Sequence, residues 1–177
     1  MNVVQTEIPG VLIIEPKVFG DSRGFFMETF QAARYREAGI DMPFVQDNHS
    51  RSGKNVLRGL HLQRAKPQGK LVRVVRGAVF DVAVDVRRGS ATFGQWVGVE
   101  LSEDNKRQFW VPPGFAHGFV TLADIVDFEY KCTDYYDPSD EVCVRWDDPD
   151  IGIVWPVDGP QLSSKDANGV ALKDLWR

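Results

Sequence analysis

The feature that most constrains the fold of this chain is a strict alternation of side-chain type in its middle. Across residues 78–86 every second residue is large and apolar, namely Phe80, Val82, Val84 and Val86. Two of the residues between them are charged, Asp81 and Asp85. Because successive side chains of a β-strand point to opposite faces, this pattern predicts a strand with one well-packed face.

The same period of two recurs further along the chain. It is carried by two more sets of residues, Val97, Val99 and Leu101, and Val126, Phe128, Tyr130 and Cys132. Gly77, Gly89 and the Pro-Pro-Gly segment at 112–114 separate the strands as turn residues do. Several short strands with turns between them indicate a sandwich or barrel, so we expect a mainly β jelly-roll barrel.

Only two segments are predicted to be helical. The first covers about residues 29–38 and is followed by Gly39, a residue type that commonly ends helices. The second is a short helix near the C-terminus, where Ser163 or Ser164 is suited to cap the segment that begins with Lys165.

The length of 177 residues fits one domain, and no internal repeat or linker divides it, so residues 1–177 are expected to form a single domain. The net charge of −4 argues against broad nucleic-acid binding, which requires a basic face. No apolar run approaches the roughly 18 residues of a membrane-spanning helix. The two cysteines, Cys132 and Cys143, have no metal-type or redox-type spacing, and no signal segment opens the chain. We therefore expect a cytoplasmic protein.

Basic residues nevertheless gather in one stretch: Arg51, Lys54, Arg58, Arg64, Lys66, Lys70, Arg73 and Arg76. This stretch could meet an anionic small ligand, because a local excess of positive charge attracts anions. It could equally be a solvated basic edge. The residues alone leave both interpretations open.

Two of the three histidines stand in distinctive surroundings. His61 lies in the segment 58–63, Arg-Gly-Leu-His-Leu-Gln, and His117 lies in the segment 112–119, Pro-Pro-Gly-Phe-Ala-His-Gly-Phe. These segments resemble the two half-motifs of a cupin barrel. Metal-binding cupins usually offer two histidines one residue apart in the first half-motif, and Gln63 takes the second position here. A neutral amide is a poor ligand for a first-row metal, so no metal is expected and His61 is available for proton chemistry.

The chain resembles the dTDP-4-dehydrorhamnose 3,5-epimerase family over nearly its whole length. The similarity is carried by seven segments in matching order and spacing, at residues 17–26, 45–50, 56–61, 68–70, 114–119, 130–131 with 135–136, and 162–166. One such motif would be a weak signal, whereas seven in sequence are specific. The resemblance implies a cupin-type jelly roll with a few short helices, and an isomerase of dTDP-L-rhamnose synthesis that needs no cofactor.

The reaction that the resemblance implies inverts carbons 3 and 5 of dTDP-4-dehydro-6-deoxy-D-glucose and gives dTDP-4-dehydro-L-rhamnose. Hydrogens next to a ketone are weakly acidic, so the reaction needs a base, a group that stabilises the enolate, and an acid on the opposite face. The residues at the family's catalytic positions are His61 as the base, Asp166 as its partner, Lys70 at the ketone oxygen and Tyr130 as the acid.

Residue types alone also allow simpler interpretations. A histidine near an aspartate is often only a satisfied core pair, and Tyr130 could be a packed core tyrosine with a hydrogen-bonded hydroxyl. Asp166 is more than a hundred residues from His61, so only the family match pairs them. The parity that Tyr130 shares with Val126 and Phe128 predicts that its side chain points into the barrel.

The resemblance also implies which residues bind the dTDP-4-keto-6-deoxy sugar. Arg23 and Arg58 match diphosphate and sugar contacts, since guanidinium groups suit phosphate oxygens. Phe19 and Tyr136 match the pair that stacks on thymine. The other matched positions carry hydrogen-bonding side chains, namely Glu28, Gln46, Asp47, Asn48, Lys70, His117, Glu141 and Lys165. In the family the contacts around residues 19–28 come from the neighbouring subunit, so a homodimer with shared sites is expected.

Two local features depart from a simple match. The family commonly has a proline a few residues after the aspartate, whereas this chain has Asn-Gly-Val at 168–170, so a looser backbone is expected near Asp166. Strict alternation would also set Arg58 and His61 on opposite faces of one strand, although both are expected in one site. A β-bulge at Gly59 would reconcile them, because an extra residue shifts the parity.

Three other functions stay open. A relative of the same fold could invert one carbon only or move the keto group. A metal-dependent cupin is disfavoured by Gln63. A non-catalytic cupin that binds sugar nucleotides is disfavoured because His61, Lys70, Tyr130 and Asp166 occur together.

Overall fold

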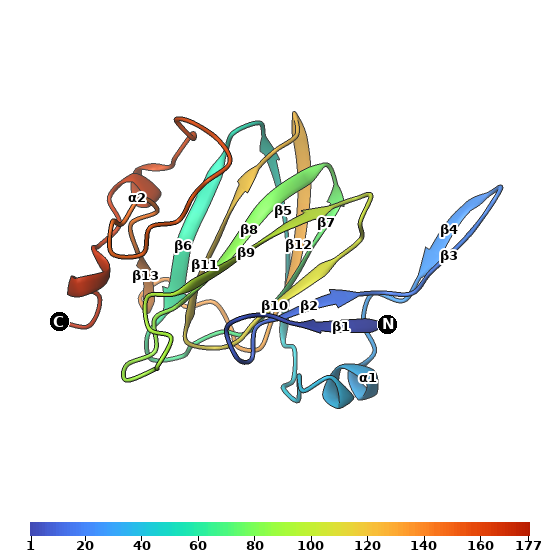
Figure 1. Cartoon of the computed structure of the whole chain (residues 1–177), viewed down its shortest axis with the longest axis horizontal. Coiled ribbons are helices and arrows are strands. Elements are labelled where there is room, and N and C mark those ends of the chain that lie inside the picture. The colour runs from blue at the N-terminus through green and yellow to red at the C-terminus, as the bar shows by residue number, and fades with distance from the viewer.

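The computed structural model describes residues 1–177 and contains two antiparallel sheets that enclose the core (Figure 1). The six-stranded sheet has the order β1 (Asn2–Gln5), β2 (Leu12–Glu15), β10 (Gln108–Val111), β7 (Lys70–Arg76), β12 (Ile125–Cys132) and β5 (Gln46–Gly53). The five-stranded sheet has the order β13 (Glu141–Cys143), β6 (Leu57–Gln63), β11 (Phe115–Thr121), β8 (Ala78–Asp85) and β9 (Trp96–Ser102). The remaining elements are the hairpin of β3 (Val18–Asp21) and β4 (Gly24–Met27), the helices α1 (Ala32–Glu37) and α2 (Ser164–Ala167), and the 3-10 helix η1 (Leu172–Asp174). None of the helices has the length and apolar character needed to cross a membrane.

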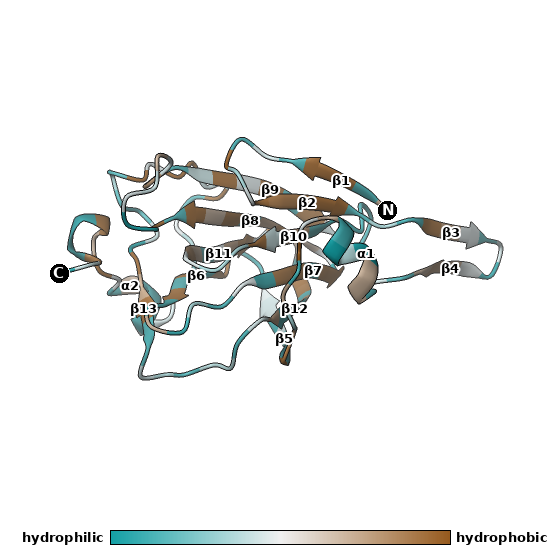
Figure 2. Cartoon of the chain, turned by 90° about the horizontal axis from the view of Figure 1, so that it is seen from below, coloured by the Kyte–Doolittle hydropathy of each residue, from teal (hydrophilic) through white to brown (hydrophobic).

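The main core lies between the two sheets. Its buried side chains come from both sheets, among them Val72, Val74, Phe109, Val126 and Phe128 on one side and Val79, Ala83, Leu101, Phe115 and Phe119 on the other. Figure 2 shows the apolar colour concentrated in the strands, while the connecting loops are mainly hydrophilic. Buried apolar area stabilises by roughly 25 cal/mol per Å², so these contacts hold the sheets together. The mainly β class predicted from the alternation is confirmed.

Strand β8 is buried on both faces, so the prediction of a single packed face is wrong for this strand. Val79 belongs to the core between the sheets, whereas Val82 belongs to a second apolar cluster on the outer side of the five-stranded sheet. Residues from the C-terminal part of the chain, including Leu172 of η1, complete that second cluster. The face that carries Asp81 and Asp85 is therefore also an interior one, and both residues are fully buried.

Helix α1 begins later than predicted. It spans Ala32–Glu37 instead of about 29–38. The carbonyl oxygen of Thr29 accepts a hydrogen bond from the side-chain amide of Gln108 at 2.7 Å, so a contact with β10 replaces the first helical hydrogen bond. Gly39 follows the helix with a φ of +93°, as its predicted role at the end of the helix requires.

A bulge in β6 brings Arg58 and His61 to the same cavity. Opposite them on β11, His117 pairs with His61 and Phe119 pairs with Arg58, so three steps along β6 match two steps along β11. The register shift falls beside Gly59, whose φ of +120° lies in the region that favours glycine. The bulge predicted from the sequence is confirmed, and it reconciles the two side chains.

We expect Gly59→Ala to destabilise the protein by at least about 1–3 kcal/mol, the usual cost of a strained backbone position. A Cβ at residue 59 would lie 2.5 Å from the Cα of Gly118 and 2.7 Å from the carbonyl oxygen of His117. Urea denaturation measures the loss. Gly53→Ala in β5 is the matched control, because a Cβ there meets nothing within 4 Å. Equal losses in the two variants would contradict the tight fit at the bulge.

The β3–β4 hairpin extends away from the barrel (Figure 1). Its aromatic side chains Phe19, Phe25 and Phe26 are 54%, 61% and 70% exposed. Exposed apolar groups gathered on one projecting element are typical of a surface that contacts another molecule.

Candidate active site

A cavity of about 440 Å³ lies between the two sheets, beside α2. Its lining residues come from both sheets, from α2 and from loops, namely Gln46, Asn48, Ser50, Arg58, His61, Gln68, Lys70, His117, Phe119, Phe128, Tyr130, Cys132, Tyr136, Glu141, Ser163, Lys165 and Asp166. The four predicted catalytic residues and most of the predicted binding residues are among them. The fold thus gathers in one place side chains that are spread over most of the sequence.

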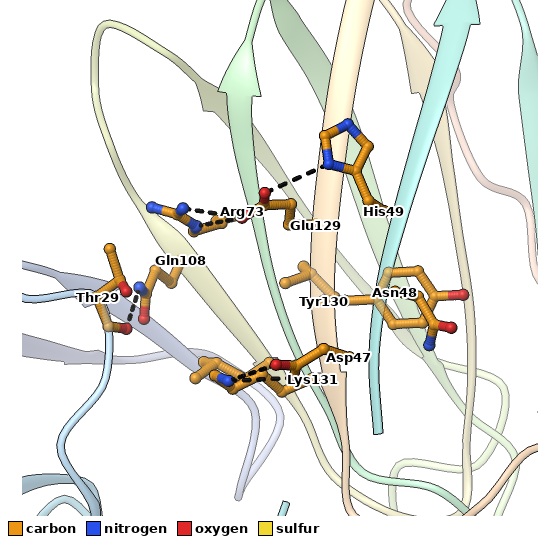
Figure 3. Close-up of a pocket in the computed structure, with 11 residues that line it drawn as sticks. Thr29, Asp47, Asn48, His49, Arg73, Gln108, Glu129, Tyr130 and Lys131 are labelled. Carbon is orange, nitrogen blue, oxygen red and sulfur yellow. Dashed lines mark hydrogen bonds and ion pairs between the residues drawn. The ribbon is translucent and has the colours of Figure 1, made fainter. Parts of the chain in front are cut away.

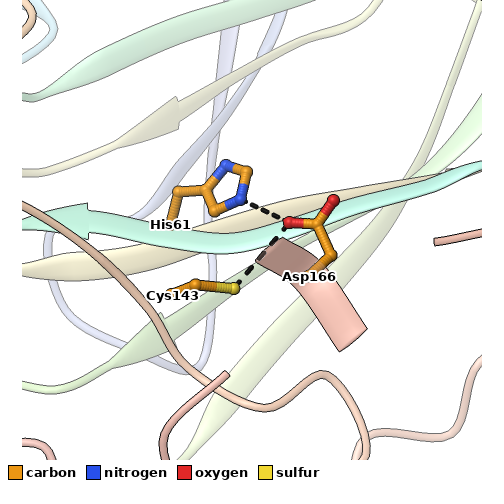
Figure 4. Close-up of side chains that lie close together, drawn as sticks. All are labelled: His61, Cys143 and Asp166. Carbon is orange, nitrogen blue, oxygen red and sulfur yellow. Dashed lines mark hydrogen bonds and ion pairs between the residues drawn. The ribbon is translucent and has the colours of Figure 1, made fainter. Parts of the chain in front are cut away.

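His61 and Asp166 form a hydrogen-bonded pair at one wall of the cavity. His61 Nε2 lies 2.6 Å from Asp166 Oδ1 (Figure 4). The other oxygen of Asp166 accepts a hydrogen bond from the Ser163 hydroxyl at 2.7 Å. Burial disfavours the carboxylate, but the hydrogen bonds from His61 and Ser163 outweigh burial and lower the pKa of Asp166 to about 2. In the tautomer in which Nε2 donates its hydrogen to the ionised Asp166, the lone pair of His61 lies on Nδ1.

Asp166 is fixed by contacts on several sides. Its backbone N–H donates to the hydroxyl of Ser163, which is the residue that caps α2, at 3.1 Å. The backbone N–H of Gly59 in the β6 bulge lies 3.4 Å from Asp166 Oδ1. Beyond the helix, the Asn168 side chain donates to the carbonyl oxygen of Ser164 at 2.7 Å, so a hydrogen bond ties down the segment in which a looser backbone was expected.

Lys70 and Tyr130 line the cavity from the six-stranded sheet. Lys70 pairs with Cys132 across β7 and β12, and Tyr130 lies two residues before Cys132, so both side chains come from adjacent strands. Tyr130 packs against Phe128, as the shared parity predicts. Burial lowers the pKa of Lys70 and raises the pKa of Tyr130 to about 12. With a pKa this high, Tyr130 keeps its proton at neutral pH. His61, on β6, belongs to the five-stranded sheet, so it lies on the sheet opposite Tyr130.

His117 is held by a residue that the sequence analysis did not single out as functional. Its Nε2 lies 2.8 Å from Asp81 Oδ1, and Asp81 is fully buried. Burial raises the pKa of Asp81, and Asp81 Oδ2 has no hydrogen-bond partner in the chain. The sequence does contain a signal for this partner role. Asp81 is a carboxyl group inside an otherwise apolar strand, and a buried carboxyl needs a partner.

Gln63 has a structural task that differs from metal binding. Its amide nitrogen donates to the carbonyl oxygens of Lys66 at 2.8 Å and Tyr135 at 3.2 Å. Its amide oxygen accepts the Asp137 N–H at 2.8 Å. These bonds tie together the two loops beside the cavity. With this amide occupied and the two histidines bound to different carboxylates, the residues do not fit the metal set of a metal-binding cupin.

Glu141 connects three side chains at the cavity edge. It accepts hydrogen bonds from the Lys165 ammonium at 2.7 Å and the Tyr136 hydroxyl at 3.0 Å, and its Oε1 lies 3.8 Å from His61 Nδ1. Burial opposes ionisation, but Lys165 and His61 outweigh it and lower the pKa of Glu141. The Tyr136 N–H donates to the side chain of Gln46 at 2.9 Å, which fixes the exposed tyrosine at the entrance.

Comparison with known proteins identifies the family. The model of the dTDP-4-dehydrorhamnose 3,5-epimerase family matches residues 5–174. The chain belongs to this family. It is 61% identical over 170 residues to the dTDP-4-dehydrorhamnose 3,5-epimerase of Salmonella typhimurium, an alignment that covers 94% of this chain and 93% of that protein. The isomerase class expected from the sequence is confirmed.

Solved structures agree with this epimerase family. The dTDP-6-deoxy-D-glucose-3,5-epimerase of Legionella pneumophila, in complex with dTDP-4-keto-L-rhamnose, is 58% identical with a TM-score of 0.96 and covers 98% of this chain and 94% of its own. ChmJ, a 3'-monoepimerase from Streptomyces bikiniensis in complex with dTDP-quinovose, is 37% identical with a TM-score of 0.90 and covers 95% of this chain and 86% of its own. The cupin-type jelly roll expected from the sequence is confirmed.

Asp47 is matched to a binding position of the epimerase family but does not line the cavity. It lies on β5 between Gln46 and Asn48, and those two side chains do line the cavity. Alternation therefore turns Asp47 to the outer face, where it forms an ion pair with Lys131 at 3.0 Å (Figure 3). The sequence match alone could not show this orientation.

Three further matched residues, Phe19, Arg23 and Glu28, also lie outside the cavity of their own chain. Phe19 and Arg23 belong to the projecting β3–β4 hairpin and its turn, and Arg23 pairs with Asp21 at 2.6 Å. Glu28 follows the hairpin and pairs with Arg34 at 2.6 Å. Within one chain these residues are therefore separate from His61 and its neighbours.

Some residues of the basic stretch at 51–76 suit the binding of an anionic ligand, and others form a solvated edge. Arg58 and Lys70 line the cavity, as an anion-binding role would require. Arg51 instead lies at the surface, where it pairs with Asp127 across β5 and β12 at 2.7 Å. Strand alternation separates the two groups.

Proposed function

We propose that this member of the epimerase family inverts carbons 3 and 5 of dTDP-4-dehydro-6-deoxy-D-glucose and forms dTDP-4-dehydro-L-rhamnose. The proposal is supported by one arrangement above all: His61 with Asp166 lines one side of the cavity, and Lys70 with Tyr130 lines the sheet opposite. A base and an acid on opposite walls can remove and return a proton on opposite faces of one carbon, which inversion requires.

Each inversion transfers two protons. Nδ1 of His61 takes the proton from the carbon beside the ketone, and the ionised Asp166 stabilises the imidazolium that results. The negative charge moves to the ketone oxygen, where the Lys70 ammonium stabilises it. The Tyr130 hydroxyl then returns a proton to the other face. The ketone itself makes the neighbouring C–H acidic, so these four groups suffice without metal, nucleotide cofactor or redox step.

Turnover in heavy water tests the reaction. After each of the two inversions His61 must release its proton to solvent and Tyr130 must regain one, so we expect deuterium at both carbon 3 and carbon 5 of the product, detected by NMR. Label at one carbon only would reduce the activity to that of a single-site enzyme such as ChmJ, which is a 3'-monoepimerase. Movement of the keto group without inversion would identify a ketoisomerase.

We expect activity to fall on the alkaline side at a lower pH than an ordinary lysine would give. Burial lowers the pKa of Lys70 below its usual 10.5, so the stabilising cation is lost as the pH rises through that lowered value. Tyr130, with a pKa of about 12, titrates later. In a profile of kcat against pH, Lys70→Arg should move the alkaline limb to higher pH, since arginine stays charged. An unmoved limb would assign it to another group.

We propose that the nucleotide part of the substrate occupies the outer end of the same cavity. Arg58 carries a guanidinium group that suits a diphosphate, and the ring of Tyr136, 49% exposed at the entrance, suits stacking on thymine. Gln46, Asn48 and Lys165 add hydrogen-bonding groups along this wall. The binding energy of the nucleotide would then hold the reacting sugar between His61 and its partners.

We propose a homodimer in which the β3–β4 hairpin of one subunit completes the site of the other. The exposed Phe19 and the charged Arg23 lie on this projecting element, away from the cavity of their own chain. Co-expression of His61→Asn with Arg23→Ala tests the sharing. Each parent should be weak, and the mixture should recover about a quarter of full activity, because half of the dimers are mixed and each of these has one intact site. No recovery would mean that each subunit builds its site alone.

We also propose a cytoplasmic location. Cys132 and Cys143 are buried free thiols, and structural disulfides are rare in the cytoplasm. Cell fractionation should recover the protein with cytoplasmic enzymes, and its recovery outside the cytoplasm would contradict this part of the proposal.

A further inference from the structure

Three potential metal-ligand atoms converge at one point, and one of them belongs to His61. His61 Nε2 and Cys143 Sγ both approach the same oxygen, Asp166 Oδ1, at 2.6 Å and 3.8 Å (Figure 4). All three donor atoms lie within 4.8 Å of one another. The side chains come from β6, β13 and α2, so the convergence is a property of the fold and not of a local sequence motif.

The three groups are held in place before any ligand binds. Cys143 is directly opposite His61 in the register of β13 and β6. Asp166 is fixed by the hydroxyl of Ser163, and Cys143 and Asp166 are only 8% and 4% exposed. The three side chains are therefore ordered in the free protein, although the spacing of His61 and Asp166 must widen before a cation can enter.

We propose that His61, Cys143 and Asp166 form an inhibitory site for zinc. One nitrogen, one thiolate sulfur and one carboxylate oxygen are ligands that zinc binds at about 2.0–2.3 Å in a tetrahedral arrangement. Such an arrangement sets the ligand atoms about 3.3–3.8 Å apart. The contact between His61 and Asp166 must open by about 1 Å, and the cation takes the place of the hydrogen-bonding proton between them.

The protons balance in this binding step. Nε2 of His61 gives up its hydrogen, and the imidazole takes a proton on Nδ1, where the Glu141 carboxylate at 3.8 Å can accept the new N–H bond. The imidazole thus changes tautomer without a net loss. Burial raises the pKa of the Cys143 thiol to about 12, so the thiol releases its proton to solvent only as the cation binds. The thiolate and the Asp166 carboxylate together neutralise the two charges of the cation.

Zinc at this site would abolish the base. Nδ1 is the atom that takes the substrate proton in the proposed function, and with zinc on Nε2 the atom Nδ1 is protonated. The part of the cavity around Arg58 and Tyr136 stays open, so dTDP should still bind while kcat falls. The inhibition rests on the proposed function, whereas the binding of the cation does not.

Cobalt and zinc titrations of the full-length protein test the proposal. Co²⁺ should give the near-ultraviolet charge-transfer band of a cobalt thiolate, and calorimetry should find one Zn²⁺ per subunit. Cys143→Ser should abolish the band and weaken zinc binding by at least about 10- to 100-fold. Cys132→Ser, which changes the other thiol of the chain, should keep both signals.

Asp166→Asn provides a second variant in case Cys143→Ser fails to fold, which circular dichroism would reveal. It keeps the thiol but loses the carboxylate, so it should also weaken zinc binding. A cobalt band that persists in Cys143→Ser, or zinc inhibition equal in wild type and Cys143→Ser, would overturn the site. Absence of the band in an active wild-type enzyme would reject the site alone, and a band in a protein without epimerase activity would reject the proposed function alone.

Discussion

His61→Asn is expected to lower kcat by about 10²–10⁴-fold, the usual contribution of a positioned general base. Asparagine keeps a side-chain N–H that can approach Asp166, so the buried carboxylate is not left without a donor. It offers no atom that can accept a proton from carbon. NMR or coupled assays of product formation measure the rate, and calorimetry with dTDP should show that nucleotide binding is retained.

The matched control for this variant is His49→Asn. His49 lies on the outer face of β5, where its Nε2 is 3.2 Å from Asp127, and its side chain is 52% exposed. The substitution removes an imidazole of the same kind outside the cavity, so activity should change little. An equal loss of turnover and dTDP binding in His61→Asn would indicate misfolding. Full activity in His61→Asn would contradict the assignment of His61 as the base.

Tyr130→Phe is expected to lower the rate of inversion by about 10²–10⁴-fold. Exchange of the substrate's carbon-bound hydrogen with solvent should continue. The variant keeps His61, Asp166 and Lys70, so it can still form the enolate. Without the hydroxyl, only His61 can return a proton, and it does so on the face from which the proton was taken. Substrate incubated in heavy water should therefore gain deuterium with its original configuration, which NMR distinguishes from the inverted product.

Tyr35→Phe is the matched control for the acid. Tyr35 is also buried, and burial raises its pKa to about 12, as for Tyr130. Its hydroxyl, however, donates to Gln108 at 2.6 Å, outside the cavity. Tyr35→Phe should lose stability but keep its turnover. If Tyr130→Phe continued to invert its substrate, or lost exchange together with inversion, another group would have to be the acid.

Local patterns in the sequence were sufficient to predict several strands and helix ends. Period-two alternation located β8 and β12 and turned Tyr130 inward, because that pattern is a property of the extended backbone itself. Gly39 after α1 and Ser163 before α2 were also readable, since the end of a helix depends on the few residues around it. The bulge at Gly59 needed the family resemblance as well, because only that resemblance places Arg58 and His61 in one site and so creates the conflict of parity.

Other features depended on contacts between distant segments. The start of α1 moved because Gln108 of β10 takes the Thr29 carbonyl. Asp81 became a partner of His117 only because β8 and β11 are adjacent in this register. The second face of β8 is buried only because the C-terminal segment packs against it. No pattern within a single element contains this information.

The sequence by itself determined the strand-rich class, the motifs of the epimerase family and the types of side chain that the chemistry needs. Only the tertiary structure decided that His61 meets Asp166, 105 residues away, and that Cys143 points at the same oxygen. It also decided that Asp47 faces away from the cavity. The physical reason is that sequence periodicity fixes the direction of a side chain relative to its own strand, whereas the register between strands and the packing of α2 fix its neighbours.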